Sequence, residues 1–275
     1  MKFSHRFFTL LILATSIPLA AAEKDTEPTN AEEAAAKKAA AEAKVDAEYA
    51  ALVAKLPPAE QAWEEVLQAE LGNFYLPIHK KERIAGRSNA WDFVKDDLAL
   101  PRVLLIGDSV SRGYTQAVRR EMKGEANVHR APANCGPTAT GLKKLDVWLG
   151  GGNWDVIHFN FGIHDRRTPP ADYEQRLDEI VTRLKATGAT VIWASTTPIP
   201  PDGKEGPEMT PAIVERNAIA ARVMEKHGVA TDDLFTFITP HLAEVQNPQD
   251  VHFNSQGYDL LGSQVAKSIR DALAR

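Results

Sequence analysis

Ser109 and His252 are the residues whose types and settings in this sequence suit nucleophilic catalysis. Ser109 follows an apolar run at 103–106, so we expect it at the carboxyl end of a buried strand, where α/β sheets bind ligands. A serine hydroxyl becomes an effective nucleophile when a nearby base accepts its proton. His252 comes immediately before the last expected helix, where the chain can place it at the same edge of the sheet as Ser109. The pair therefore predicts nucleophilic catalysis by a serine with a histidine as its general base.

Asp250 lies two residues before His252 and can complete a catalytic triad by fixing the imidazole tautomer and stabilising the imidazolium. A backbone carbonyl that orients His252 in a dyad is the alternative. A nucleotide-binding interpretation of residues 107–111 is disfavoured, because the segment has neither Gly-x-Gly-x-x-Gly nor a lysine after a phosphate-binding loop. The Gly-x-Ser-x-Gly elbow of α/β-hydrolases also fails, since Ser111 occupies its last position.

From residue 101 to the end of the chain, apolar runs alternate with helical patterns. This βαβ alternation predicts a parallel sheet with helices on both faces. The expected strands are 103–106, 127–130, 156–161, 190–194 and a short strand near Val229. The expected helices are 114–123, 140–149, 173–184, 212–226 and 255–273.

Four segments resemble, in order, the conserved blocks of the SGNH (GDSL-type) hydrolase superfamily. Residues 107–110 (Gly-Asp-Ser-Val) resemble the first block, and 134–137 (Asn-Cys-Gly-Pro) hold the glycine of the second. Residues 160–165 (Asn-Phe-Gly-Ile-His-Asp) resemble the third block, and 250–252 (Asp-Val-His) the last. An ordered set of blocks is far more specific than a single motif. Over residues 101–275 the resemblance implies a flavodoxin-like three-layer α/β/α sandwich, with a mostly parallel sheet of about five strands.

The resemblance also implies hydrolysis of carboxylic esters through an acyl-enzyme on Ser109, with no metal or other cofactor. In that family the oxyanion is bound by the backbone N–H of the nucleophile, the N–H of the second-block glycine and the third-block asparagine side chain. The corresponding groups here are Ser109, Gly136 with Gly141 in reserve, and His164 at the asparagine position. A neutral imidazole has one N–H to donate, so His164 can replace the amide. Asn160 is a second candidate donor.

Two positions depart from the family pattern. His164 replaces the third-block asparagine, and the usual acid position three residues before the histidine is held by Gln249 instead of Asp250. Loss of one oxyanion donor lowers turnover about a hundredfold to a thousandfold. A non-catalytic carbohydrate-binding protein of the same fold is therefore one alternative, and an O-acyltransferase is another. Of the remaining block residues, Asp108 is expected to brace its turn and Asp165 to orient its loop.

The expected substrate is a small-molecule or glycan ester. Export and family analogy favour O-acetyl groups on a polysaccharide. Trp148, Trp154 and Trp193 can either stack on sugar rings or pack in the domain. A formal net charge of -5 at pH 7 provides no basic field for phosphates, which disfavours a nucleic-acid partner. No pattern in the sequence fixes the oligomeric state.

Residues 1–22 combine basic residues, an apolar run and a small-residue end, as a secretory signal peptide requires. The run is shorter than the roughly 20 residues that span a bilayer, so we expect cleavage, export to the periplasm or the medium, and no stable membrane span. An uncleaved anchor is the alternative. Residues 23–100 are expected to form a helical spacer and connector, with helical patterns at 31–56 and before Gly72 and irregular structure over 73–100.

Overall fold

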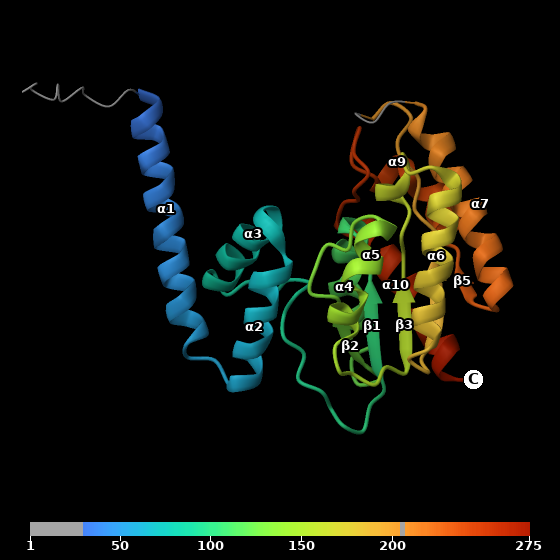
Figure 1. Cartoon of the computed structure of the whole chain (residues 1–275), viewed down its shortest axis with the longest axis horizontal. Coiled ribbons are helices and arrows are strands. Elements are labelled where there is room, and N and C mark those ends of the chain that lie inside the picture. Colours follow the sequence, from blue (N-terminus) through green and yellow to red (C-terminus); the bar gives the residue numbers. More distant parts are fainter. Residues whose placement is uncertain (1–29, 204–206) are drawn as a thin grey trace, which may run out of the picture. The chain divides into compact units, whose positions relative to one another are not determined.

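The computed structural model describes residues 30–203 and 207–275 (Figure 1). The expected signal peptide, residues 1–22, lies outside these ranges. Within them, no helix is both long enough and apolar enough to cross a membrane.

The chain divides into two units between Lys44 and Val45, and the second unit spans Val45–Arg275. Helix α1 (Asn30–Val53) begins in the first unit and ends in the second. Its sequence is rich in alanine, glutamate and lysine, which favour helix without requiring a buried face. The expected boundary between connector and hydrolase domain, at residue 100, falls inside the second unit.

A five-stranded sheet lies in the second unit, with strand order β2-β1-β3-β4-β5 (Figure 1). Every pair of neighbouring strands is parallel, as the βαβ alternation predicts. The strands are β1 (Arg102–Ile106), β2 (Asn127–Arg130), β3 (Val156–Phe159), β4 (Thr190–Ala194) and β5 (Ala230–Asp232). The expected α/β fold with a parallel sheet of five strands is confirmed.

Helices cover both faces of the sheet and complete the three layers (Figure 1). One face packs against α4 (Ser109–Glu121), α8 (Leu234–Ile238) and α10 (Ser255–Leu273). The other packs against α5 (Thr138–Leu149), α6 (Pro170–Lys185) and α7 (Met209–His227). A short helix, α9 (Leu242–Val245), and two 3-10 helices, η1 (Ile163–Asp165) and η2 (Thr239–His241), lie in the connections.

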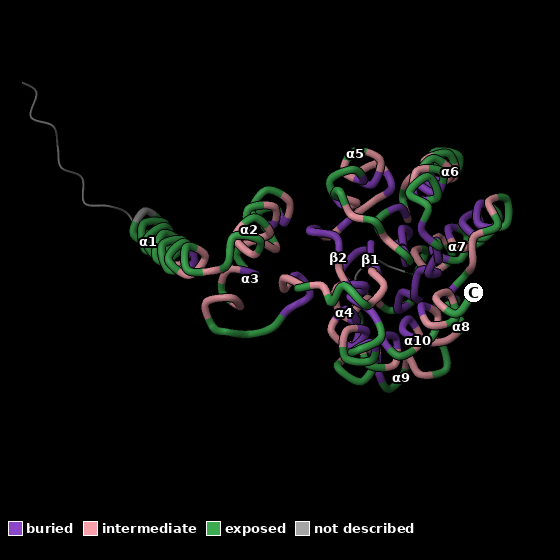
Figure 2. The backbone as a smooth tube through the Cα atoms, turned by 90° about the horizontal axis from the view of Figure 1, so that it is seen from below, coloured by how far each residue is buried: buried purple, intermediate pink, exposed green. Residues whose placement is uncertain are grey.

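Strand β1 shows how the sequence builds two cores. Val103 and Leu105 join one hydrophobic cluster, whereas Leu104 and Ile106 join the other. This alternation follows from the two-residue period of a strand, and both faces are apolar because helices cover both. Figure 2 shows the buried residues along the strands and the inward sides of the helices. The carboxyl edge of this rigid sheet positions the site.

Two further helices precede the sheet, α2 (Pro58–Glu70) and α3 (Gly72–Ile84). The expectation of irregular structure after residue 72 is wrong for the segment that forms α3. Its sequence lacks a sustained apolar period and contains Pro77, so the pattern gave no helix signal. Gly72, which follows the second expected helical pattern, is the first residue of α3, with a φ of 65°.

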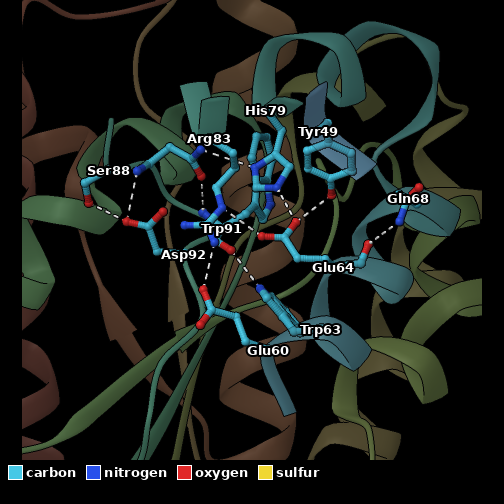
Figure 3. Close-up of polar contacts among 11 residues, drawn as sticks. Tyr49, Glu60, Trp63, Glu64, Gln68, His79, Arg83, Ser88, Trp91 and Asp92 are labelled. Carbon is cyan, nitrogen blue, oxygen red and sulfur yellow. Dashed lines mark hydrogen bonds and ion pairs between the residues drawn. The ribbon is translucent and has the colours of Figure 1, made fainter. Parts of the chain in front are cut away.

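Glu64 of α2 is a buried carboxylate that holds these helices together (Figure 3). Its Oε2 accepts hydrogen bonds from the Tyr49 hydroxyl and from His79 Nε2, both at 2.7 Å. Arg83 Nε lies 2.8 Å from Oε1. Asn89 donates to His79 Nδ1 at 3.2 Å, so the neutral imidazole carries its proton on Nε2. The network links α1, α2 and α3, and it supplies the tertiary contacts that local sequence lacks.

Replacement of Glu64 by Gln is expected to lower the free energy of unfolding by about 3 kcal/mol, because it leaves the half-buried Arg83 without its buried counter-charge. Burial raises the pKa of the Glu64 carboxyl, but hydrogen bonds from His79 and Tyr49 and the nearby positive charges outweigh burial and hold the pKa below 4.5. The stabilisation is therefore present above pH 4.5 and is lost as the pH falls through the folded-state pKa. Urea unfolding of the parent, of Glu64→Gln and of the exposed control Glu65→Gln measures the change in the free energy of unfolding. Equal unfolding midpoints for the parent and Glu64→Gln at neutral pH would contradict the predicted loss of stability.

Candidate active site

A two-residue turn joins β1 to α4 and places Ser109, the first residue of α4, at the carboxyl edge of the sheet. Asp108 caps the helix, since its Oδ1 accepts a hydrogen bond from Val110 N at 2.9 Å. A Cβ at Gly107 would come within 2.7 Å of Ser111 Cβ, so the turn requires glycine there. At the start of a helix the N–H of Ser109 has no intrahelical partner, and the helix dipole favours negative charge near it.

Ser109, His252 and Asp250 form a continuous hydrogen-bonded chain. His252 Nε2 lies 2.7 Å from Ser109 Oγ, and His252 Nδ1 lies 2.8 Å from Asp250 Oδ1. With the carboxylate accepting from Nδ1–H, the neutral ring presents Nε2 as a base toward the hydroxyl. The structure thus brings together the three residues that the sequence analysis selects for a triad.

The loop before α10 explains how an acid two residues before the histidine reaches the ring. Asn247 N donates to His252 O at 2.9 Å, and Asp250 N donates to Asn247 O at 3.1 Å. Gln249 adopts a φ of 55°, which tightens the turn. His252 N also donates to Asp250 Oδ1 at 3.3 Å. Burial raises the pKa of the Asp250 carboxyl, but the hydrogen bond and charge of His252 outweigh burial and lower it.

Gly136 lies on the loop between β2 and α5 with a φ of 66°, a conformation that favours glycine. The neighbouring Cys135 N donates to Gly107 O at 3.1 Å and ties this loop to the turn before α4. The reserve candidate, Gly141, lies inside α5, and its backbone N–H donates to Pro137 O at 3.1 Å. Of these two glycines, Gly136 is therefore the candidate oxyanion donor.

The side-chain amide of Asn160 is engaged within the protein. Its Nδ2 donates to Ala194 O at 2.8 Å and to Thr196 Oγ1 at 3.1 Å, so both of its hydrogens have acceptors. This arrangement gives Asn160 a structural role instead of the expected role as a second oxyanion donor. His164 is exposed on η1, in the third block. It remains the side-chain candidate for the oxyanion site.

Asp165 fastens the second block to the third. Its fully buried carboxylate accepts hydrogen bonds from Thr138 N at 2.8 Å, Thr138 Oγ1 at 2.7 Å and Thr168 Oγ1 at 3.0 Å. Its backbone oxygen accepts from Arg216 Nε at 3.0 Å. These contacts fix the loop that carries Gly136 against η1, in agreement with the expectation that Asp165 orients its loop.

Arg130, at the end of β2, contacts the turn before α4 and is not among the residues predicted for the site. The buried guanidinium donates from Nη2 to Gly107 O and Asp108 O, both at 2.9 Å, and from Nη1 to Ser111 Oγ. Burial lowers the pKa of this group. The sequence feature that could have indicated this role is a charged residue, Arg130, at the end of a short strand that is expected to be buried. By bridging two carbonyls, Arg130 holds the turn in one conformation.

A three-layer α/β sandwich with a hydrogen-bonded serine, histidine and aspartate at the carboxyl edge of its sheet defines the class of serine hydrolases. The model of the GDSL-like lipase/acylhydrolase family matches residues 105–260. Because this match spans more than half of the chain, the chain belongs to that family, which confirms the resemblance to SGNH hydrolases. The protein is a serine hydrolase that acts on ester bonds.

Solved structures share the fold. A lipase/acylhydrolase from Enterococcus faecalis superposes with a TM-score of 0.56 at 22% identity, over 62% of this chain and 96% of its own. An acetylxylan esterase from Geobacillus stearothermophilus gives 0.53 at 15% identity, over 62% and 94%. An alpha/beta hydrolase enzyme from the metagenome of Lake Arreo, Spain, gives 0.53 at 17% identity, over 61% and 94%. Among curated proteins, none matches the chain.

Proposed function

We propose that the protein is an exported esterase that removes O-acetyl groups from polysaccharides through an acyl-enzyme on Ser109. The observation that supports this most directly is the 2.7 Å contact between His252 Nε2 and Ser109 Oγ, continued to Asp250. A complete hydrogen-bonded triad favours turnover over the non-catalytic carbohydrate-binding alternative, because binding alone needs no such alignment.

In the proposed mechanism, His252 accepts the proton of Ser109 as Oγ attacks the ester carbonyl. The N–H groups of Ser109 and Gly136 and the imidazole of His164 bind the oxyanion of the tetrahedral intermediate. His252 returns the proton to the leaving alcohol, and the acyl group stays on Oγ. Water then attacks the acyl-enzyme with His252 again as base. The carboxylic acid leaves and the serine hydroxyl is restored.

The exposure of the site supports a polymeric substrate. The side chains of His252 and Asp250 are 34% and 47% exposed, so the base and the acid lie near the surface, where a chain too long to enter a closed cavity can reach them. A solved structure of the same fold is an acetylxylan esterase, which suggests acetyl as the acyl group. The export part of the proposal rests on the sequence of residues 1–22.

The His164→Ala variant is expected to lower kcat by about a hundredfold to a thousandfold, because one donor to the oxyanion is lost. His164→Asn restores a donor of the type that the family uses and should recover most of the activity. Steady-state hydrolysis of p-nitrophenyl acetate measures both variants. If His164→Ala retains the parent kcat, the side-chain donor is another group.

The proposed function is tested with p-nitrophenyl acetate and acetylated xylan, by measuring the release of p-nitrophenol and acetate. We expect both substrates to be hydrolysed. Added xylo-oligosaccharide separates hydrolysis from acyl transfer, since an acyltransferase would produce acetylated sugar at the expense of free acetate. Failure to release acetate from any acetylated polysaccharide would contradict the proposed substrate class, and inertness toward every ester would contradict esterase function itself.

A further inference from the structure

A cavity lies along the outer edge of β2, one of the two edge strands of the sheet. Its volume is about 410 Å³, within the roughly 300–1,000 Å³ of small-molecule sites. Its lining comes from α2, residues 92–96, β2, the end of α5 and the loop 150–154. The lining includes none of the triad residues Ser109, Asp250 and His252, so the cavity is distinct from the active site.

Aromatic and charged side chains both line this cavity, which we call the β2-edge cavity. The partly exposed Trp63 and Trp154 supply apolar surface. The Asp96 carboxylate pairs with two nitrogen groups of the lining. Its Oδ2 lies 2.8 Å from Arg102 Nε, and its Oδ1 lies 2.6 Å from His129 Nε2. Aromatic rings next to paired donors and acceptors are what a sugar requires, because its C–H faces are apolar and its hydroxyls both donate and accept.

Two buried donors in the lining have no acceptor among the described residues. Trp148 is 3% exposed and Arg130 is 1% exposed, and neither Trp148 Nε1 nor Arg130 Nε makes a hydrogen bond. Both residues line the β2-edge cavity. Buried donors are rarely left unsatisfied, so each such group calls for a ligand or solvent acceptor. A ligand rich in hydroxyl oxygens supplies acceptors of this kind.

We infer that the β2-edge cavity binds a neutral saccharide unit, at a site separate from the active site. An acyl chain is disfavoured because Arg102, His129 and the carboxylates would lose hydration against it without forming hydrogen bonds. The charged groups in the lining have both signs, and Asp96 already pairs with Arg102 and His129, so a neutral ligand leaves these ion pairs intact. A neutral polyol can bond to both kinds of group and stack on the indoles.

The cavity shares one residue with the active-site turn. Arg130 lines the cavity and also donates to the carbonyls of Gly107 and Asp108, immediately before Ser109. A sugar that accepts from Arg130 Nε therefore contacts the side chain that holds the turn. For a polysaccharide esterase, such a site retains the polymer while acetyl groups are removed elsewhere. This last step rests on the proposed function, whereas saccharide binding itself does not.

The test is calorimetric titration of the full protein with the hexasaccharides of β-1,4-linked xylose, glucose and mannose, all without acetyl groups. The key variant is Gly151→Trp, which is intended to narrow the cavity, since Gly151 lines it and a Cβ at this glycine meets no atom within 4 Å. Val214→Trp, on the exposed surface of α7, is the matched control. Trp148→Phe keeps a ring and removes the unpaired N–H.

We expect the parent to bind one of these hexasaccharides, the Gly151→Trp variant to bind it roughly tenfold or more weakly, and Val214→Trp to bind it as the parent does. Trp148→Phe should weaken binding severalfold. No binding of any hexasaccharide, or equal binding by the parent and Gly151→Trp, would overturn the inference. Binding without ester hydrolysis would instead contradict the proposed function alone, and hydrolysis without binding would contradict the cavity assignment alone.

Discussion

Replacement of Ser109 by Ala is expected to lower kcat for p-nitrophenyl acetate by about ten-thousandfold to a millionfold, because no other group can carry the acyl intermediate. Ser109 Oγ lies 2.7 Å from His252 Nε2, and the variant removes that oxygen while leaving the α4 N-terminus in place. Ser263→Ala, an exposed serine on α10, is the matched control and should keep parental activity.

The measurement is steady-state hydrolysis by the parent and both variants, with near-ultraviolet circular dichroism to confirm that each is folded. Ser109 is buried, but its replacement by Ala removes only one oxygen atom, so the fold should persist. A folded Ser109→Ala variant that retains more than about a tenth of the parental kcat would mean that the hydroxyl is not the nucleophile.

The Asp250→Asn variant is expected to lower kcat by about a hundredfold to ten-thousandfold. The Asp250 carboxylate accepts from His252 Nδ1 at 2.8 Å, which keeps Nε2 unprotonated toward Ser109. An amide can donate to Nδ1 instead, which favours the wrong tautomer, and it cannot stabilise the imidazolium. Asp271→Asn, whose exposed carboxylate pairs with Lys267, serves as the control.

Two outcomes separate a triad from a dyad. If Asp250→Asn stays within about threefold of the parent, a backbone carbonyl orients the ring and the triad assignment is wrong. In a triad that acts as a unit, the double variant Ser109→Ala with Asp250→Asn should be no less active than Ser109→Ala alone. Additive losses would show that Asp250 contributes to catalysis by a route that does not depend on Ser109.

The three central strands of the sheet could be predicted from the sequence because each is mostly apolar. The run at 103–106 is apolar at every position, and its two faces divide between two cores as a covered parallel strand requires. Helix α3 shows the opposite case. Its pattern is weak and contains Pro77, and buried contacts such as His79 with Glu64 stabilise it from outside the segment. A tertiary hydrogen bond of this kind has no local signature.

The site was predictable only in part, for a similar reason. Ser109 could be selected because it follows a strand, and His252 because it precedes the last helix. Their contact at 2.7 Å depends on the tertiary fold, and the reach of Asp250 depends on the left-handed conformation of Gln249. The role of Arg130 could not be predicted, because two of its acceptors are backbone carbonyls, and these are present at every position of any sequence.

The most direct test of a serine acyl-enzyme is to mix the protein with p-nitrophenyl acetate, quench in acid within milliseconds to seconds, and map the acetylated peptide by mass spectrometry. We expect an acetyl group on Ser109 in the parent and none on the same peptide of Ser109→Ala. Two results would contradict an acyl-enzyme on Ser109. One is turnover with no acetylated Ser109 at any quench time, and the other is acetylation confined to another residue.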